Sequence, residues 1–232
     1  MLSAVVLGTV NTWMIFIIGA RLKNKLTGLY AAILFTASIY CFVIAGTFIL
    51  PDTPQVFFWL LSILFLTNVF FSNHKQSKKN IYLILAGITI GLGMLSKYTT
   101  IFLWAGTMIY ILFYDRQWLK RSDLYISILS SVILFLPVIN WNILNDWISF
   151  TYQGERANLF ASGININSFL REMAGQILYN NPVNVALIIL ALFAITMKKR
   201  ILSSNRNKFL LLTSVPLILT FLFVSLFRGT LP

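Results

Sequence analysis

Apolar runs of membrane-spanning length, separated by short polar segments, recur along the whole chain. They cover residues 2–20, 29–50, 55–71, 81–114, 125–138 with its continuation, 182–197 and 209–227. Runs of about 20 apolar residues are typical of helices that cross a lipid bilayer. The pattern therefore predicts an all-α polytopic membrane protein.

The run at 81–114 is too long for a single crossing. As one helix it would extend about 51 Å at about 1.5 Å per residue, whereas the hydrocarbon core of a bilayer is about 30 Å thick. Lys97 is its one charged residue, and a break at Lys97–Tyr98 gives two helices of about 24 Å each. Each half is a little shorter than the core, so length alone does not decide between one helix and two.

The distribution of charge decides for two helices, and we therefore predict about eight transmembrane helices with both termini on the outer side. The polar loops at 21–28, 72–80, 115–124 and 198–208 carry net charges of +3, +3, +1 and +5, which together equal the net charge of the chain, +12. With a break at Lys97 all of these loops lie on one side, and loops rich in Lys and Arg are typically cytoplasmic. The basic excess therefore indicates membrane orientation, and we expect no nucleic-acid partner.

Composition leaves little material for a soluble domain. Of the residues, 58% are hydrophobic and only 10% are charged, whereas about a quarter are charged in a soluble domain. We predict one transmembrane domain, 1–232, with an extracytoplasmic loop at 140–181. In this loop, apolar residues at helical spacing predict an amphipathic helix on the membrane surface: Ile166, Phe169, Leu170, Met173, Ile177 and Leu178.

Asp52 lies in the short turn between the second and third runs, within GTFILPDTPQVFFW. A carboxylate at the edge of a bilayer is costly and indicates a functional site. Asp52 could act as the general base on an acceptor hydroxyl, or help to hold a divalent metal. The alternative is structural, because Asp52 or Thr53 could cap the helix predicted at 55–71, with Pro54 in its first turn.

Several cations are predicted on the same outer side. Lys97 is recessed in the outer leaflet, where it could bind a lipid phosphate, although simple snorkelling to the interface would also explain it. Arg156, beside Tyr152 and Gln153, could add a second phosphate donor. A salt bridge from Arg156 to Glu155 is the alternative for this pair.

Four stretches together resemble the motifs of a known family. They are PDTPQVFFW, GLGMLSKYTTIFL, PVINWNILNDWISFTYQ and RGTLP. The chain is similar to the bacterial branch of the dolichyl-phosphate-mannose–protein mannosyltransferases, glycosyltransferase family 39, which has the lipid A aminoarabinose transferases as relatives. All belong to the GT-C class of integral-membrane glycosyltransferases.

The resemblance implies transfer of a sugar from a polyprenyl-phosphate donor, outside the cytoplasm and with inversion at the anomeric carbon. The acceptor would be a lipid, glycan or protein, the location the bacterial inner membrane, and a divalent metal of unspecified identity is often involved. Asp52 corresponds to the family's second outer acid and Lys97 to the lysine of its S-K-Y segment. The other expected lipid-phosphate or substrate contacts on the matching stretches are Tyr98, Tyr152, Gln153, Arg156 and Arg228.

Two other membrane functions stay open from the sequence. A transporter or lipid flippase would carry charges midway along its helices and show internal repeats, and a polysaccharide polymerase or ligase would not need the Asp52 motif. The sequence opens at what resembles the family's second helix, without the first helix and the acid-bearing first outer loop. We therefore expect these 232 residues to be a fragment, from a split gene, a misplaced start or a decayed copy, that does not transfer sugar unaided.

Overall fold

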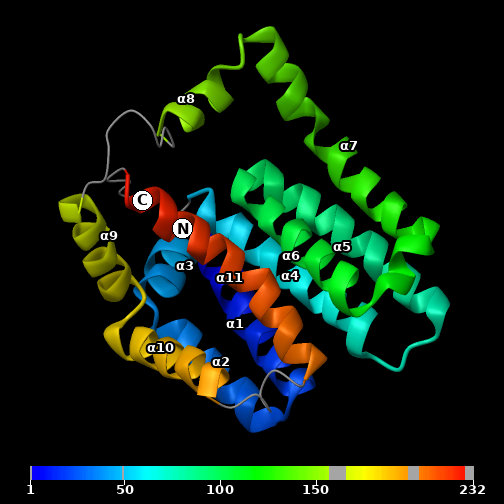
Figure 1. Cartoon of the computed structure of the whole chain (residues 1–232), viewed down its shortest axis with the longest axis horizontal. Coiled ribbons are helices and arrows are strands. Elements are labelled where there is room, and N and C mark those ends of the chain that lie inside the picture. Colours follow the sequence, from blue (N-terminus) through cyan, green and yellow to red (C-terminus); the bar gives the residue numbers. More distant parts are fainter. Residues whose placement is uncertain (1, 49, 157–165, 198–203, 228–232) are drawn as a thin grey trace.

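The computed structural model describes residues 2–48, 50–156, 166–197 and 204–227 (Figure 1). In the described residues the regular structure is entirely helical. In chain order the elements are α1 (Leu2–Leu22), α2 (Lys25–Ala37), the π-helical turn η1 (Tyr40–Ile44), α3 (Ala45–Thr47), α4 (Asp52–Phe71), α5 (Gln76–Ser96), the 3₁₀ turn η2 (Tyr98–Thr100), α6 (Ile101–Tyr114), the 3₁₀ turn η3 (Arg116–Lys120), α7 (Ser122–Leu144), α8 (Ile148–Arg156), α9 (Ile166–Tyr179), α10 (Pro182–Met197) and α11 (Asn205–Ser225).

The all-α membrane architecture predicted from the sequence is confirmed. Within the described residues, 5 helices are long and apolar enough to cross a membrane, or up to 7 if each of two bent helix pairs is one span. A shorter apolar helix, Tyr98–Tyr114, adds to these. The predicted break at Lys97 is present, because α5 ends at Ser96 and Lys97 has extended backbone angles before η2 begins. The count of eight spans stays a prediction.

The predicted single span at 29–50 is wrong in one respect, because the chain bends by 77° between α2 and the segment Tyr40–Thr47. Ser38 has extended backbone angles, φ −73° and ψ 122°. Its hydroxyl accepts a hydrogen bond from Cys41 N at 3.4 Å and its carbonyl accepts one from Phe42 N at 2.9 Å. Serine caps a new helix in this way, so the helix restarts in a new direction.

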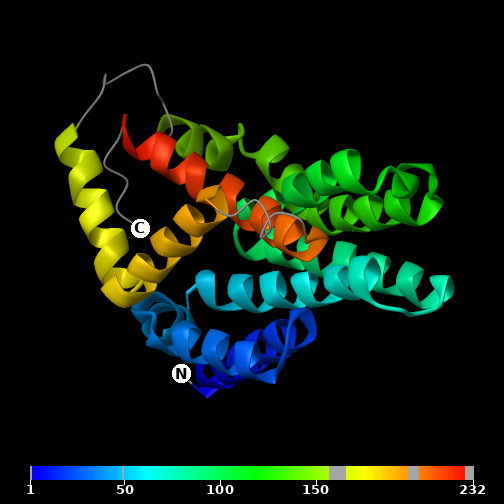
Figure 2. The same ribbon diagram turned by 60° about the horizontal axis from the view of Figure 1, so that its bottom comes forward.

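Helix α4 is the centre of the bundle. It packs against α1 on one side and α5 on the other, α5 packs against α7, and α6 packs against α11; in Figure 2 the α1–α2 pair lies below α4. The α5–α7 contact is close because Gly87 has no side chain: a Cβ there would lie 2.1 Å from the carbonyl oxygen of Ser127. This confirms that the spacing of Gly87 and Gly91 serves helix packing.

The described parts of the four basic loops lie at one end of the bundle. Arg21 donates to Asn68 Oδ1 at 3.1 Å, which joins the end of α1 to the end of α4. Arg121 donates to Asn80 Oδ1 at 3.0 Å, and Arg206 donates to the carbonyl of Leu22 at 2.8 Å. The last two contacts join the 115–124 loop to the 72–80 loop and the 198–208 loop to the 21–28 loop. The contact from Arg21 ties this second pair to the end of α4, which leads into the 72–80 loop. That this end is cytoplasmic stays a prediction.

The predicted amphipathic helix is present as α9, and it lies to one side of the bundle (Figure 2). It bends by 105° from the following helix across Asn180 and Asn181. Helix α7 continues to Leu144 and so extends into the predicted loop at 140–181. That α9 lies on the membrane surface stays a prediction.

Candidate functional site

Asp52 and Lys97 form an ion pair at the end of the bundle opposite the basic loops. Asp52 is the first residue of α4, and Lys97 directly follows the last residue of α5. The Lys97 ammonium donates to Asp52 Oδ1 at 2.7 Å. The Asp52 side chain is only 15% exposed and that of Lys97 is 42% exposed. The carboxylate is therefore largely enclosed, while its cationic partner reaches the surface.

The structure does not use Asp52 as the cap of its helix. The N-cap position is Pro51, which makes no side-chain capping bond. The Thr53 hydroxyl donates to the carbonyl of Phe48 at 2.7 Å and so caps nothing in α4. Helix α4 also begins three residues earlier than predicted, since Asp52 itself is helical. The Asp52 carboxylate is thus directed to groups on other elements.

Gln55 makes a second connection between the start of α4 and the segment that follows Lys97. Its side-chain amide donates to Thr99 Oγ1 at 2.7 Å and to Thr100 Oγ1 at 3.4 Å. Thr100 fits closely over Gly93, where a Cβ would lie 2.6 Å from Thr100 Cγ2. Sequence reasoning missed Gln55. The available signal was an amide residue at the start of an apolar run, three residues after Asp52 and therefore on the same helix face.

Tyr40 is the second side chain that contacts the Asp52 carboxylate. Its hydroxyl donates a hydrogen bond to Asp52 Oδ1, the oxygen that Lys97 also contacts. Sequence reasoning missed Tyr40, because it lies within an apolar run read as one continuous helix. The signal that could have found it is the hydroxyl itself, since a buried tyrosine usually has a hydrogen-bond partner.

Tyr98 packs into an aromatic cluster beside the ion pair. Its ring stacks on Phe150, with centroids 5.4 Å apart and an interplanar angle of 23°, and meets the ring of Phe135 edge-on at 5.6 Å. Trp147 lies 5.8 Å from Phe150. The cluster brings α7 and α8 over the start of η2.

The WNILNDW stretch builds the turn that makes this cluster. Asn142 is fully buried, its carbonyl accepts from Trp147 N at 2.8 Å, and its side chain accepts from Ser149 N at 3.2 Å. Asp146 and Trp147 both have positive φ, 52° and 58°, which is the left-handed region that few residues adopt. The stretch therefore turns the chain sharply from α7 into α8.

The remaining predicted contacts are only partly described. Tyr152 lies in α8 and is 53% exposed. Gln153 and Arg156 belong to the same helix, but their side chains, and that of Glu155, lie outside the described part. The predicted pairing of Arg156 therefore stays a prediction. Arg228 lies outside the described residues altogether.

The described residues do not by themselves make a metal site. Among them, no group of three or more His, Cys, Asp or Glu side chains could hold an ion. Asp52 Oδ1 already accepts from Tyr40 and Lys97. A divalent cation bound mainly through substrate phosphates needs only one or two carboxylates, so the expected metal stays a prediction and we assign it no step.

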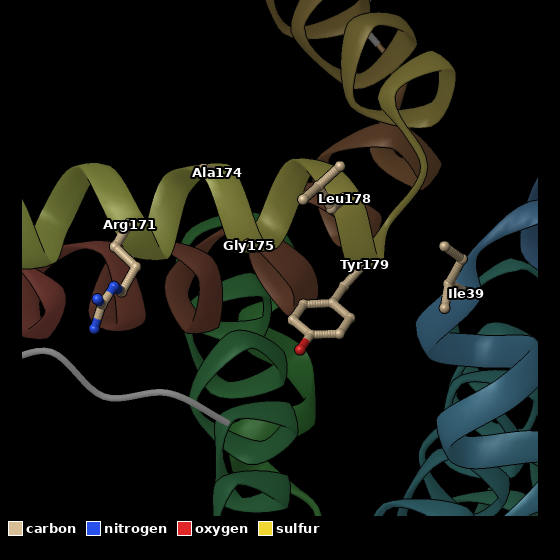
Figure 3. Close-up of a pocket in the computed structure, with 6 residues that line it drawn as sticks. All are labelled: Ile39, Arg171, Ala174, Gly175, Leu178 and Tyr179. Carbon is tan, nitrogen blue, oxygen red and sulfur yellow. The ribbon is translucent and has the colours of Figure 1, made fainter.

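An apolar pocket of about 460 Å³ lies between α9 and the bend that follows α2. Its lining residues are Ile39, Arg171, Ala174, Gly175, Leu178 and Tyr179. Figure 3 shows the Arg171 and Tyr179 side chains extending from the same side of α9, with Ile39 on the opposite wall. Ile39 directly precedes Tyr40 in the chain, so this pocket adjoins the turn that carries the Asp52 contact.

Comparison of the sequence with known protein families gives a match over most of the chain. Residues 1–141 match the family described as dolichyl-phosphate-mannose-protein mannosyltransferase. The match includes Tyr40, Asp52, Gln55 and Lys97. The chain belongs to this family. The resemblance inferred from the sequence motifs is thereby confirmed.

A curated relative of this mannosyltransferase-family chain is the lipid A galacturonosyltransferase RgtD of Rhizobium johnstonii. The two are 24% identical over 176 residues, which is 76% of this chain and 36% of RgtD. The chain thus spans about a third of the length of the relative it matches. No solved structure matches it.

Proposed function

We propose that the protein is a membrane glycosyltransferase that moves a sugar from a polyprenyl-phosphate donor to a hydroxyl acceptor on the extracytoplasmic side. The observation that carries this proposal is the contact of 2.7 Å between Lys97 and the enclosed carboxylate of Asp52. The pair lies at the end of the bundle opposite the basic loops. Membership of a mannosyltransferase family supports the same reaction.

In the proposed reaction, Asp52 acts on the acceptor. The acceptor oxygen forms a bond to the anomeric carbon while the bond from that carbon to the phosphate oxygen breaks. The Asp52 carboxylate takes the hydroxyl proton and so raises the nucleophilicity of the oxygen. Tyr40 and Lys97 both contact Oδ1, so neither of these contacts uses Oδ2, which we assign to the acceptor.

Lys97 acts on the leaving group. An ammonium has three N–H donors, and the structure directs one of them to Asp52. The side chain is 42% exposed, so its other N–H groups can reach a lipid phosphate. The negative charge that develops on the leaving polyprenyl phosphate would then be stabilised by a charge-assisted hydrogen bond.

The apolar pocket offers a place for the lipid portion of a substrate. Its apolar wall is formed by Ile39 and by Ala174 and Leu178 of α9, and Arg171 is its one cation. A mostly apolar cavity with few polar groups is typical of a site for a lipid-like ligand. Because RgtD is named a lipid A galacturonosyltransferase, we favour a lipid acceptor over a glycan or protein.

The test is sugar transfer in membranes of the source organism, where any further segment or subunit is also present. Membranes from wild-type cells and from cells lacking the gene receive a radiolabelled polyprenyl-phosphate sugar, and label in the lipid fraction is followed. We expect transfer in the wild type, loss of transfer in the deletion, and recovery when the gene is returned. Equal transfer in both membranes would refute the proposed function.

A further inference from the structure

Tyr40 makes a contact that the proposed reaction has not yet used. Its hydroxyl donates to Asp52 Oδ1, beside the Lys97 ammonium. We propose that Tyr40 is a positioning residue that holds the Asp52 carboxylate in its reactive orientation while Lys97 engages the donor phosphate. This inference rests on the proposed function and deepens it.

The local backbone directs Tyr40 towards Asp52. The chain bends by 77° at the end of α2 and then forms the π-helical turn Tyr40–Ile44. The N–H of Ala45 donates to the carbonyl of Tyr40, five residues earlier. A π-helical turn changes the direction in which side chains leave the helix, and such turns are frequent at functional sites. A continuous α-helix through this segment would not place Tyr40 in the same way.

Close backbone packing fixes the turn. A Cβ on Gly8 of α1 would lie 3.1 Å from the Cα of Gly46, so α3 and α1 approach directly through their backbones. A Cβ on Gly46 would also lie 2.9 Å from the carbonyl of Cys41. Helix α3, which directly continues the turn that carries Tyr40, is therefore held by α1. This gives Tyr40 support from a helix, as a positioning group requires.

Tyr40 and Lys97, which both donate to Asp52 Oδ1, have side chains suited to different tasks. A lysine ends in a point charge on a flexible four-carbon stem, so Lys97 can shift between Asp52 and a phosphate. A tyrosine has only two side-chain torsions, and Tyr40 is half-buried. Tyr40 therefore keeps the carboxylate in place when the Lys97 contact loosens.

The test is the variant Tyr40→Phe, assayed in the source-organism membranes with the labelled polyprenyl-phosphate sugar. Removing one hydrogen bond to a charged group should lower kcat by about 10-fold and leave the KM for the donor within about 2-fold. Tyr30→Phe, which removes an exposed hydroxyl from α2, is the matched control and should leave both constants unchanged. Rates are expressed per molecule of membrane-inserted protein, so a lower folding yield does not imitate the effect.

A second comparison separates positioning from a general structural role. In an Asp52→Asn background, Tyr40→Phe should cause no further loss, because residues that act through one group are not additive. The same fold-loss in both backgrounds, or a wild-type kcat for Tyr40→Phe alone, would overturn the inference. Absence of transfer by the wild-type membranes would instead overturn the proposed function, and this inference with it.

Discussion

The environment of Lys97 differs from that of a lysine that simply extends to the membrane interface. It contacts the carboxylate of Asp52, and its side chain is still 42% exposed. A snorkelling lysine would direct its ammonium to water, whereas this ammonium is divided between a carboxylate and the surface. Under the proposed function, this position lets the Lys97 ammonium contact both the residue that acts on the sugar acceptor and the phosphate of the sugar donor.

Lys97→Ala should weaken use of the polyprenyl-phosphate donor by about 1.5–3 kcal/mol, the contribution of a hydrogen bond to a charged group. Lys97→Arg should be partly tolerated, because a guanidinium also binds phosphate. The measurement is the KM and kcat/KM for the donor in membranes. A donor dependence unchanged in Lys97→Ala would return this residue to the snorkelling interpretation.

The sequence identified Asp52 and Lys97 separately but not the contacts around them. Each stands out as a charge within or beside an apolar run, and the cost of burying a charge makes such positions visible. Tyr40 and Gln55 are uncharged and lie within apolar runs, so the same reasoning passes over them. Their contacts appear only in the structure, where the bend after α2 brings Tyr40 to Asp52 and η2 brings Thr99 to Gln55.

Helix packing could be predicted from the sequence only where the residues allow a single arrangement of the helices. The Gly87 and Gly91 spacing correctly predicted a close helix contact, because absent side chains allow backbones to approach. The bend after α2 was missed, since Ser38 is a small polar residue that a straight helix also tolerates. The Ser38 hydroxyl accepts a hydrogen bond from Cys41 N, and the periodicity of apolar residues gives no sign of this contact.

Gly87→Ala should destabilise the bundle by about 1–3 kcal/mol, the usual cost of overpacking. The added Cβ would lie 2.1 Å from the Ser127 carbonyl oxygen, a backbone atom that cannot move aside cheaply. Gly154→Ala is the control, because no atom lies within 4 Å of a Cβ there, and helix propensity alone favours alanine. The measurement is the free energy of unfolding in detergent. Equal stability of Gly87→Ala and wild type would contradict the packing described.

At the scale of the molecule, the two ends differ in charge and in chemistry. One end gathers the basic loops through bonds such as that from Arg21 to Asn68. The other holds Asp52, Lys97 and the Tyr98 cluster. This separation agrees with the sidedness predicted from the loops, although the bends within the helices could not be read from charge.

Reporter fusions test this orientation. Fusions at Ser77, Ser122 and Ser204 should report the cytoplasm, and fusions at Ser162 and Pro232 the outer side, because basic loops stay inside. A phosphatase active only outside and a fluorescent protein active only inside give opposite readouts at each site. A cytoplasmic signal at Ser162 would contradict the orientation.

The central claim is that Asp52 is the base of sugar transfer, and its most direct test is Asp52→Asn in single-turnover transfer. Source-organism membranes are saturated with labelled polyprenyl-phosphate sugar, and product is measured per molecule of inserted protein. The amide keeps the shape of the side chain but removes its basicity, so we predict a rate at least about 100-fold lower, the contribution of a general base. Near-normal transfer by Asp52→Asn at normal membrane levels would contradict the account.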